Sequence, residues 1–101
     1  MAFGITKHDV ERWKEQVSNG QIAFLTHYWF DPRFPQYKTV TKAGCSTLER
    51  LIDWGAQYGL EAEWIDYHEG YPHFDLLGDK QYQILLKENC LEQIQRFSLS
   101  K

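Results

Sequence analysis

One segment, residues 21–29, constrains the fold most, because it is apolar on both faces of a strand. Alternate side chains of a strand point in opposite directions, so one face carries Phe24, Thr26 and Tyr28 and the other carries Leu25, His27 and Trp29. A strand of this kind is typical of a sheet that is covered on both sides. We therefore predict an α/β or α+β fold, with about three helices around a sheet of three or four strands. Residues 22–29 are the predicted central strand.

The composition provides enough apolar surface for a packed core. The chain has 101 residues, of which 43% are hydrophobic and 16% aromatic. Each Trp, Tyr or Phe removes about 150–250 Å² of surface from water when it is buried, and this burial offsets the entropy lost on folding. A chain of this length is typical of one domain, so we expect residues 1–101 to fold as a single domain.

Charge and hydropathy argue against several classes of protein. The formal net charge of -3 disfavours nucleic acid as a partner, although a local basic patch would still allow it. The longest apolar stretch, residues 22–25, is far shorter than the roughly 20 residues that cross a membrane. The N-terminus shows no basic segment followed by an apolar run, and Cys45 and Cys90 make no disulfide framework. We expect a cytoplasmic protein.

Two helices are predicted from signals at their ends. Thr6 and Asp9 have the spacing of a capping box, and an apolar stripe follows them. Ser46 and Glu49 have the same spacing before the second helix. Gly59 stands where a helix ends in a left-handed residue. The first helix is therefore expected to begin near residue 7 and the second to run to about residue 58.

The remaining elements are less sharply marked. A second strand is predicted at residues 39–41, near an edge of the sheet, because lysines flank it and edge strands tolerate lysine. A third helix is predicted at 79–88, with Asn89 as its stop and Gly78 or Asp79 as its cap. Residues 61–67 fit a strand or a helical turn, and residues 90–97 fit either a strand or a helix.

Four short runs, taken in order and spacing, resemble a known group. They are Cys-Ser-Thr-Leu-Glu at 45–49, Trp-Gly-Ala-Gln-Tyr-Gly-Leu at 54–60, Glu-Trp-Ile at 63–65 and Pro-His-Phe-Asp-Leu at 72–76. The chain resembles the YneQ-like bacterial proteins. It is also similar to a broader family of domains of unknown function that carry a His-[Tyr/Phe]-Asp-Leu segment. That second resemblance covers residues 22–97, implies a terminal strand at 90–97 and implies no particular activity.

His73 and Asp75 are the first candidate site residues. Two residues apart in an extended strand, they share one face. Asp75 would then orient His73 for proton transfer, or both would bind a metal. The alternative is structural, with Asp75 capping or bracing the helix at 79–88.

A second candidate group follows the first strand. His27 lies near the strand's C-terminal end, where ligands bind in open α/β sheets, and Asp31 and Arg33 follow in a loop. Together, His27, Asp31, His73 and Asp75 would make a His₂Asp₂ site for a divalent metal. The alternative is an Asp31–Arg33 turn beside an aromatic cluster.

A third group is basic and aromatic. Arg33, Lys38 and Lys42, with Trp29 nearby, would bind a nucleotide or a single strand by stacking and phosphate contacts. The alternative is an edge strand protected by its lysines, which the acidic total charge favours. These residues are our candidates for ligand binding.

Two functions remain open from the sequence. The preferred one is a binding or interaction module with a polar cluster beside an aromatic surface, with a homodimer as one arrangement. The other is a small metal-assisted hydrolase or transferase that uses His27, Asp31, His73 and Asp75. No Walker loop, dinucleotide-binding fingerprint or HExxH motif occurs, so no cofactor is evident, and a divalent metal stays open.

Overall fold

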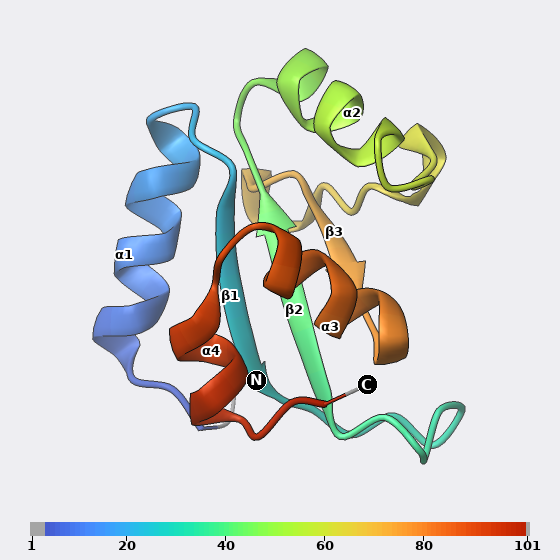
Figure 1. The fold of residues 1–101 in the computed structure, drawn as a ribbon. Coiled ribbons are helices and arrows are strands. Elements are labelled where there is room, and N and C mark those ends of the chain that lie inside the picture. Colours follow the sequence, from blue (N-terminus) through green and yellow to red (C-terminus); the bar gives the residue numbers. More distant parts are fainter. Residues whose placement is uncertain (1–3, 101) are drawn as a thin grey trace.

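Antiparallel pairing orders the three strands β1 (Ala23–Tyr28), β2 (Thr39–Gly44) and β3 (His73–Leu76), with β2 in the centre (Figure 1). This computed structural model describes residues 4–100. The helices are α1 (Lys7–Ser18), α2 (Leu48–Ala56), α3 (Gly78–Lys87) and α4 (Leu91–Arg96), with short 3₁₀ turns η1 (Ala62–Trp64) and η2 (His68–Gly70). The described residues make one small α+β domain. The prediction about the N-terminus includes residues 1–3, which lie outside the described range.

The order of the strands corrects the prediction for residues 22–29. β1 is an edge strand, and β2, which was predicted near an edge, is central and extends to Gly44. The lysine pattern was misleading because Lys42 points into an open region on one face of the sheet. The outer edge of β1 is instead covered by α4, where Gln93 donates its side-chain amide to the carbonyl of Phe24 over 3.0 Å.

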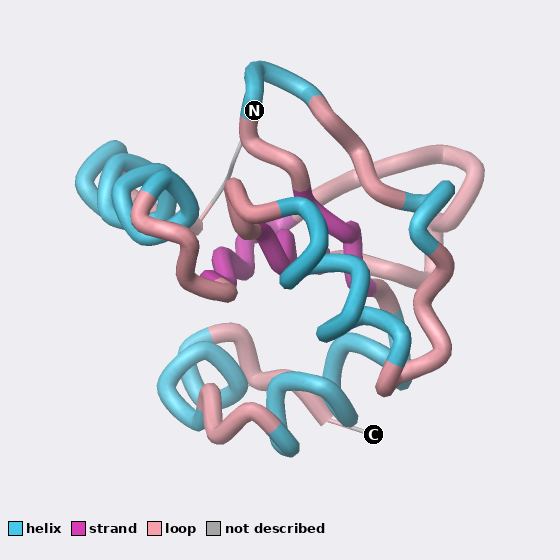
Figure 2. Tube along the Cα trace, turned by 90° about the horizontal axis from the view of Figure 1, so that it is seen from above, coloured by secondary structure: helices cyan, strands magenta, loops and turns pink. Residues whose placement is uncertain are grey.

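The segment at 90–97 forms a helix, so the expected terminal strand is wrong. Residues 91–96 make α4, and Phe97, just beyond it, is buried. Cys90 donates its backbone N–H to the carbonyl of Leu85 over 2.8 Å, which closes the turn between α3 and α4. The described residues therefore contain four α-helices around the strands, which lie in the middle of the molecule (Figure 2).

The predicted helix ends are mostly confirmed. Thr6 and Asp9 make both bonds of a capping box, at 2.8 and 3.1 Å. Gly59 and Asn89 have positive φ, 75° and 62°. Ser46, however, does not cap α2, and the N-cap of α3 is Leu77. The Ser46 N–H donates to the carbonyl of Val17 over 3.0 Å, and the N-cap position of α2 falls on the next residue. Ser46 is held at the end of α1, so the start of α2 shifts by one position.

The register divides the side chains between two faces of the sheet. The face we call the covered face packs against α2, α3 and α4 and carries Phe24, Thr26, Thr41, Ala43, Phe74 and Leu76. The opposite face, which we call the cleft face, carries Leu25, His27, Val40, Lys42, His73 and Asp75. The alternation of side chains along each strand therefore places His27, His73 and Asp75 on the same face of the sheet.

α1 covers only part of the cleft face. Trp13 is its anchor, since it is buried and donates its indole N–H to the carbonyl of Ala23 over 3.1 Å. Gly44 makes this approach possible, because a Cβ there would lie 2.7 Å from the Trp13 ring. Within residues 4–100, no α-helix covers the rest of the cleft face.

The longest helix within residues 4–100 is α1, with 12 residues. No helix in this range combines the length and the apolar character needed to cross a bilayer.

Candidate ligand-binding cleft

The uncovered part of the cleft face forms a cleft of about 580 Å³. Six residues that the sequence singled out line it: His27, Trp29, Arg33, Lys42, His73 and Asp75. They come from all three strands and from the loop after β1. Antiparallel pairing places the strand residues His27, Lys42, His73 and Asp75 on one face of the sheet.

His73 has one ring nitrogen fixed and one directed at acidic groups. Its Nδ1 lies 2.7 Å from the carbonyl oxygen of Tyr71. A carbonyl only accepts, so Nδ1 carries the proton of this bond. In the neutral ring, Nε2 then presents a lone pair, 3.6 Å from Asp75 Oδ1 and 4.0 Å from Asp66 Oδ2. The side chain is 5% exposed, so its orientation is held by packing.

Asp66 is the cluster residue that sequence reasoning missed. It pairs with His73 through two backbone hydrogen bonds, of 2.9 and 2.8 Å, in an isolated antiparallel bridge. This pairing carries the Asp66 carboxylate to the outer side of β3. The local pattern of residues 61–67 fits a strand or a helical turn, but it does not identify His73 as the pairing partner.

Asp75 lies opposite Lys42 in the β2–β3 pair. Desolvation by the surrounding side chains raises the pKa of Asp75, while the charges of His73 and Lys42 act in the opposite direction. Asp75 cannot cap α3, since α3 packs on the covered face and Asp75 points to the cleft face. The N-cap of α3 is Leu77, with no side-chain bond, so the predicted caps at Gly78, Asp79 and Asp75 are all wrong.

His27 is buried, with one ring nitrogen satisfied and one not. Nδ1 donates to the carbonyl of Tyr28 over 2.8 Å, whereas Nε2 has no hydrogen-bond partner among the described residues. The residue is 4% exposed. Burial lowers the pKa of His27, and the nearby Lys42 charge lowers it further. The ring is therefore neutral near pH 7 and offers a buried acceptor to the cleft.

The rim of the cleft is aromatic and cationic. Trp29 and Phe34 stack with ring centroids 6.4 Å apart, and the Arg33 guanidinium lies 5.5 Å from the Phe34 centroid. Asp31 holds that guanidinium through an ion pair of 2.6 Å, and this bond with Arg33 lowers the pKa of Asp31 to about 2. The predicted Asp31–Arg33 turn is present.

The four predicted metal ligands do not all meet. His73 and Asp75 lie together, and Asp31 is engaged by Arg33. His27 and His73 occupy opposite outer strands, four positions apart along β2. Ordinary strand dimensions then place their Cα atoms about 16 Å apart, which is too far for one ion with bonds near 2.0–2.2 Å. Lys38 borders a different hollow, beside Tyr37 and Gly78.

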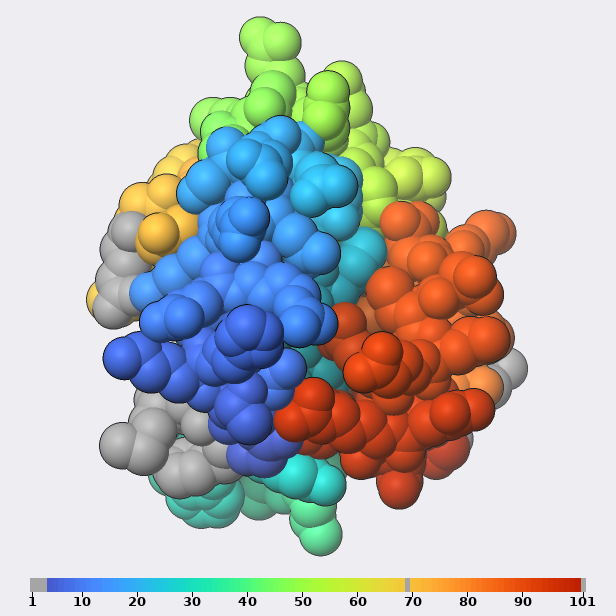
Figure 3. Space-filling model, turned by 90° about the vertical axis from the view of Figure 1, so that its left-hand side faces the viewer, coloured from blue at the N-terminus to red at the C-terminus, as the bar shows by residue number. Residues whose placement is uncertain are grey.

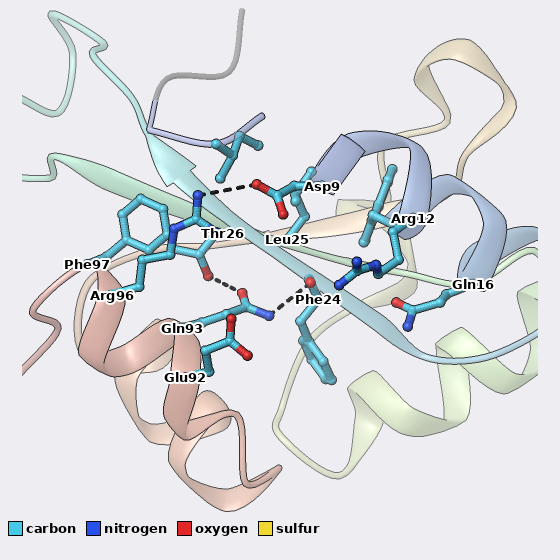
Figure 4. A pocket seen from close by; sticks show the side chains of 12 residues that line it. Asp9, Arg12, Gln16, Phe24, Leu25, Thr26, Glu92, Gln93, Arg96 and Phe97 are labelled. Atoms are coloured by element: carbon cyan, nitrogen blue, oxygen red, sulfur yellow. Dashed lines mark hydrogen bonds and ion pairs between the residues drawn. The ribbon is translucent and has the colours of Figure 1, made fainter. Parts of the chain in front are cut away.

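A second hollow lies between α1 and α4, where Figure 3 shows a furrow between the blue and red segments. Its volume is about 230 Å³. Figure 4 shows why it is a seam between elements: Arg96 pairs with Asp9 over 3.2 Å, and Gln93 bridges Thr26 and the carbonyl of Phe24. These polar groups serve the packing of α4 on β1, so the cleft is the stronger candidate site.

These features define a small α+β protein with α2, α3 and α4 on one face of an antiparallel sheet, and with α1 and a polar cleft on the other. The chain is 54% identical over 99 residues to the uncharacterized protein YneQ of Bacillus subtilis (strain 168), across 98% of this chain and 100% of that protein. It belongs to the YneQ family. No family model matches the chain, so the resemblance to a broader family stays a prediction. No solved structure matches it either.

Proposed function

We propose that the protein is a binding module whose ligand occupies the cleft on the open side of the sheet. The observation that carries this proposal is that His27, which lines the cleft, has a buried Nε2 without a hydrogen-bond partner among the described residues. A buried polar atom without a partner costs about 1–3 kcal/mol. Such an atom in a cleft is explained by a ligand that donates a hydrogen bond to it.

The chemistry of the walls suggests the class of ligand. Neutral His27 accepts a bond from an N–H or O–H group. Lys42 favours an anionic group on the ligand, whereas the Arg33 guanidinium is already paired with Asp31, and the Trp29 and Phe34 rings favour an aromatic or apolar part. We therefore propose a small organic anion with a ring and a hydrogen-bond donor.

Matched fragment probes test this proposal. We would titrate the protein with 4-hydroxybenzoate, benzoate and phenol, and follow the chemical shifts of the His27 and Trp29 rings by NMR. AMP would be titrated as well, as a nucleotide probe. The expected result is saturable binding at the cleft, tightest for 4-hydroxybenzoate. His27→Gln and Lys42→Gln should each weaken it, whereas the exposed Asp53→Asn on α2 should not. Shifts that do not saturate, or that lie outside the cleft, would refute the proposal.

A metal-assisted hydrolase or transferase is the second candidate. The observation that favours it is the position of His73 and Asp75 together at one end of the cleft. His27 and Asp31 would then act on a bound substrate and not as ligands of the same ion. The test is hydrolysis of p-nitrophenyl phosphate and p-nitrophenyl acetate with added Mn²⁺ or Zn²⁺. Activity that disappears in His73→Gln and persists in Asp53→Asn would support this function.

The homodimer stays a proposal of its own. Phe30 and Trp64 are exposed large side chains, at 76% and 54%. Exposed apolar groups of this size suit an interface between proteins. Sedimentation of the wild type against Phe30→Ser would test it, since a dimer through Phe30 should dissociate in the variant.

A further inference from the structure

One end of the cleft has the arrangement of a cation site, and this inference rests on the proposed binding cleft. We propose that Asp66, His73 and Asp75 bind one divalent transition-metal ion of the Zn²⁺ class. One ligand atom from each of the three residues lies within 4.8 Å of the others. The ion would lie at the β3 end of the cleft, with its remaining positions open toward a ligand.

The spacing fits ligands around an ion better than a direct ion pair. A charged N–H···O⁻ bond brings its atoms to about 2.7–2.9 Å, whereas His73 Nε2 lies 3.6 Å from Asp75 Oδ1. Two ligands bound at 2.0–2.2 Å to a tetrahedral ion lie about 3.3–3.6 Å apart. The 4.0 Å separation from Asp66 closes with a small movement, because that side chain is 50% exposed.

The second ring nitrogen of His73 supports the same role. Histidines that bind metals usually donate their other N–H to a carboxylate or a backbone carbonyl, which fixes the tautomer. Here Nδ1 donates to Tyr71 and leaves Nε2 as the available ligand atom. The ring also packs edge-on against Trp13, with centroids 5.9 Å apart and planes at 77°. Its lone pair is therefore aimed at the two carboxylates before any ion arrives.

A second observation in the cleft also points to a ligand. His27 lines the same cavity, too far from the cluster to share the ion, and its buried Nε2 has no hydrogen-bond partner among residues 4–100. One molecule could occupy both ends of the cleft. Its anionic group would bind the ion, and its N–H or O–H group would donate a hydrogen bond to His27. The donor set of one imidazole and two carboxylates suits borderline cations, not soft ones that need thiolate.

Metal titration without any organic probe tests the inference. We would measure Zn²⁺ binding to the full chain by competition with a fluorescent chelator, and record the visible absorption of the Co²⁺ form. The expected result is one ion per chain, with about tenfold or greater weakening in Asp66→Asn and in Asp75→Asn. Both side chains are about half exposed, so these variants should fold, and circular dichroism would check this.

The control and the outcomes separate this site from other binding. Asp53→Asn, on the exposed side of α2, should bind Zn²⁺ like the wild type. Equal affinity in all three variants, or a Co²⁺ spectrum with a thiolate band from Cys90, would overturn the proposal. A wild-type protein that binds 4-hydroxybenzoate but no Zn²⁺ would refute the metal site alone. Metal binding without any probe binding would instead refute the proposed ligand.

Discussion

His27 donates its Nδ1–H to the carbonyl of Tyr28 over 2.8 Å, and its other ring nitrogen, Nε2, is buried without a hydrogen-bond partner among the described residues. Because burial is the main cause that lowers the pKa of His27, the folded protein resists protonation of this ring. The pH dependence of stability therefore reports on the same feature that we assign to ligand binding.

We predict that acid destabilises the wild type more than His27→Gln. Above about pH 6.5, the ordinary pKa of histidine, both folded and unfolded chains hold the ring neutral. As the pH falls below this value, the unfolded chain takes up a proton first, so stability is lost until the lower folded pKa is reached. Thermal unfolding midpoints from pH 8 to pH 5 measure this. Parallel curves for the two proteins would contradict it.

Asp31 should titrate as the partner of Arg33. In the wild type, NMR titration of the Asp31 carboxyl is expected to give a pKa of about 2. In Arg33→Ala the value should rise part of the way toward 3.8, because the variant loses the side-chain bonds, which are the largest cause of the shift, and keeps the backbone N–H bond of residue 33. Addition of Zn²⁺ should leave the Asp31 signals in place, and a metal-dependent shift there would support the sequence-based ligand set instead.

Gly55 should not tolerate a methyl group, although it lies inside α2. Alanine usually stabilises a helix by about 1 kcal/mol relative to glycine. At this position a Cβ would lie 2.6 Å from the Phe74 ring, so Gly55→Ala should destabilise the protein by about 1–3 kcal/mol through overpacking. Urea unfolding measures the change. In a Phe74→Leu background the penalty should shrink, and an unchanged penalty would rule out this contact as its cause.

The polar network on the covered face should be needed for stability. Thr39 donates to Gln81 Oε1 over 3.0 Å, and Gln81 donates to Thr41 over 2.9 Å. Gln81→Leu leaves two buried threonine hydroxyls short of partners, so we expect a loss of about 1–3 kcal/mol. The matched control is Gln83→Leu on the exposed side of α3, where about 0.5 kcal/mol or less is expected. Chemical denaturation that gave equal losses would contradict the role of the network.

Much of the candidate site could be predicted because strand alternation is local. The alternation along β1 placed His27 and Trp29 on one side, and that along residues 73–75 placed His73 with Asp75. It could not show that Asp66 joins them, since that position depends on a bridge between segments separated by a turn. Alternation also could not show the large separation between His27 and His73, because that separation depends on how the strands pair.

Features that depend only on neighbouring residues follow directly from the sequence. The capping box at Thr6 and the left-handed residues Gly59 and Asn89 rest on contacts within one helical turn. Tertiary structure decided the strand order and the helix at 91–96, because both depend on which distant surfaces bury each other. It also decided the cleft: α1 reaches only as far as Trp13 can pack over Gly44, and the polar end of the sheet stays open.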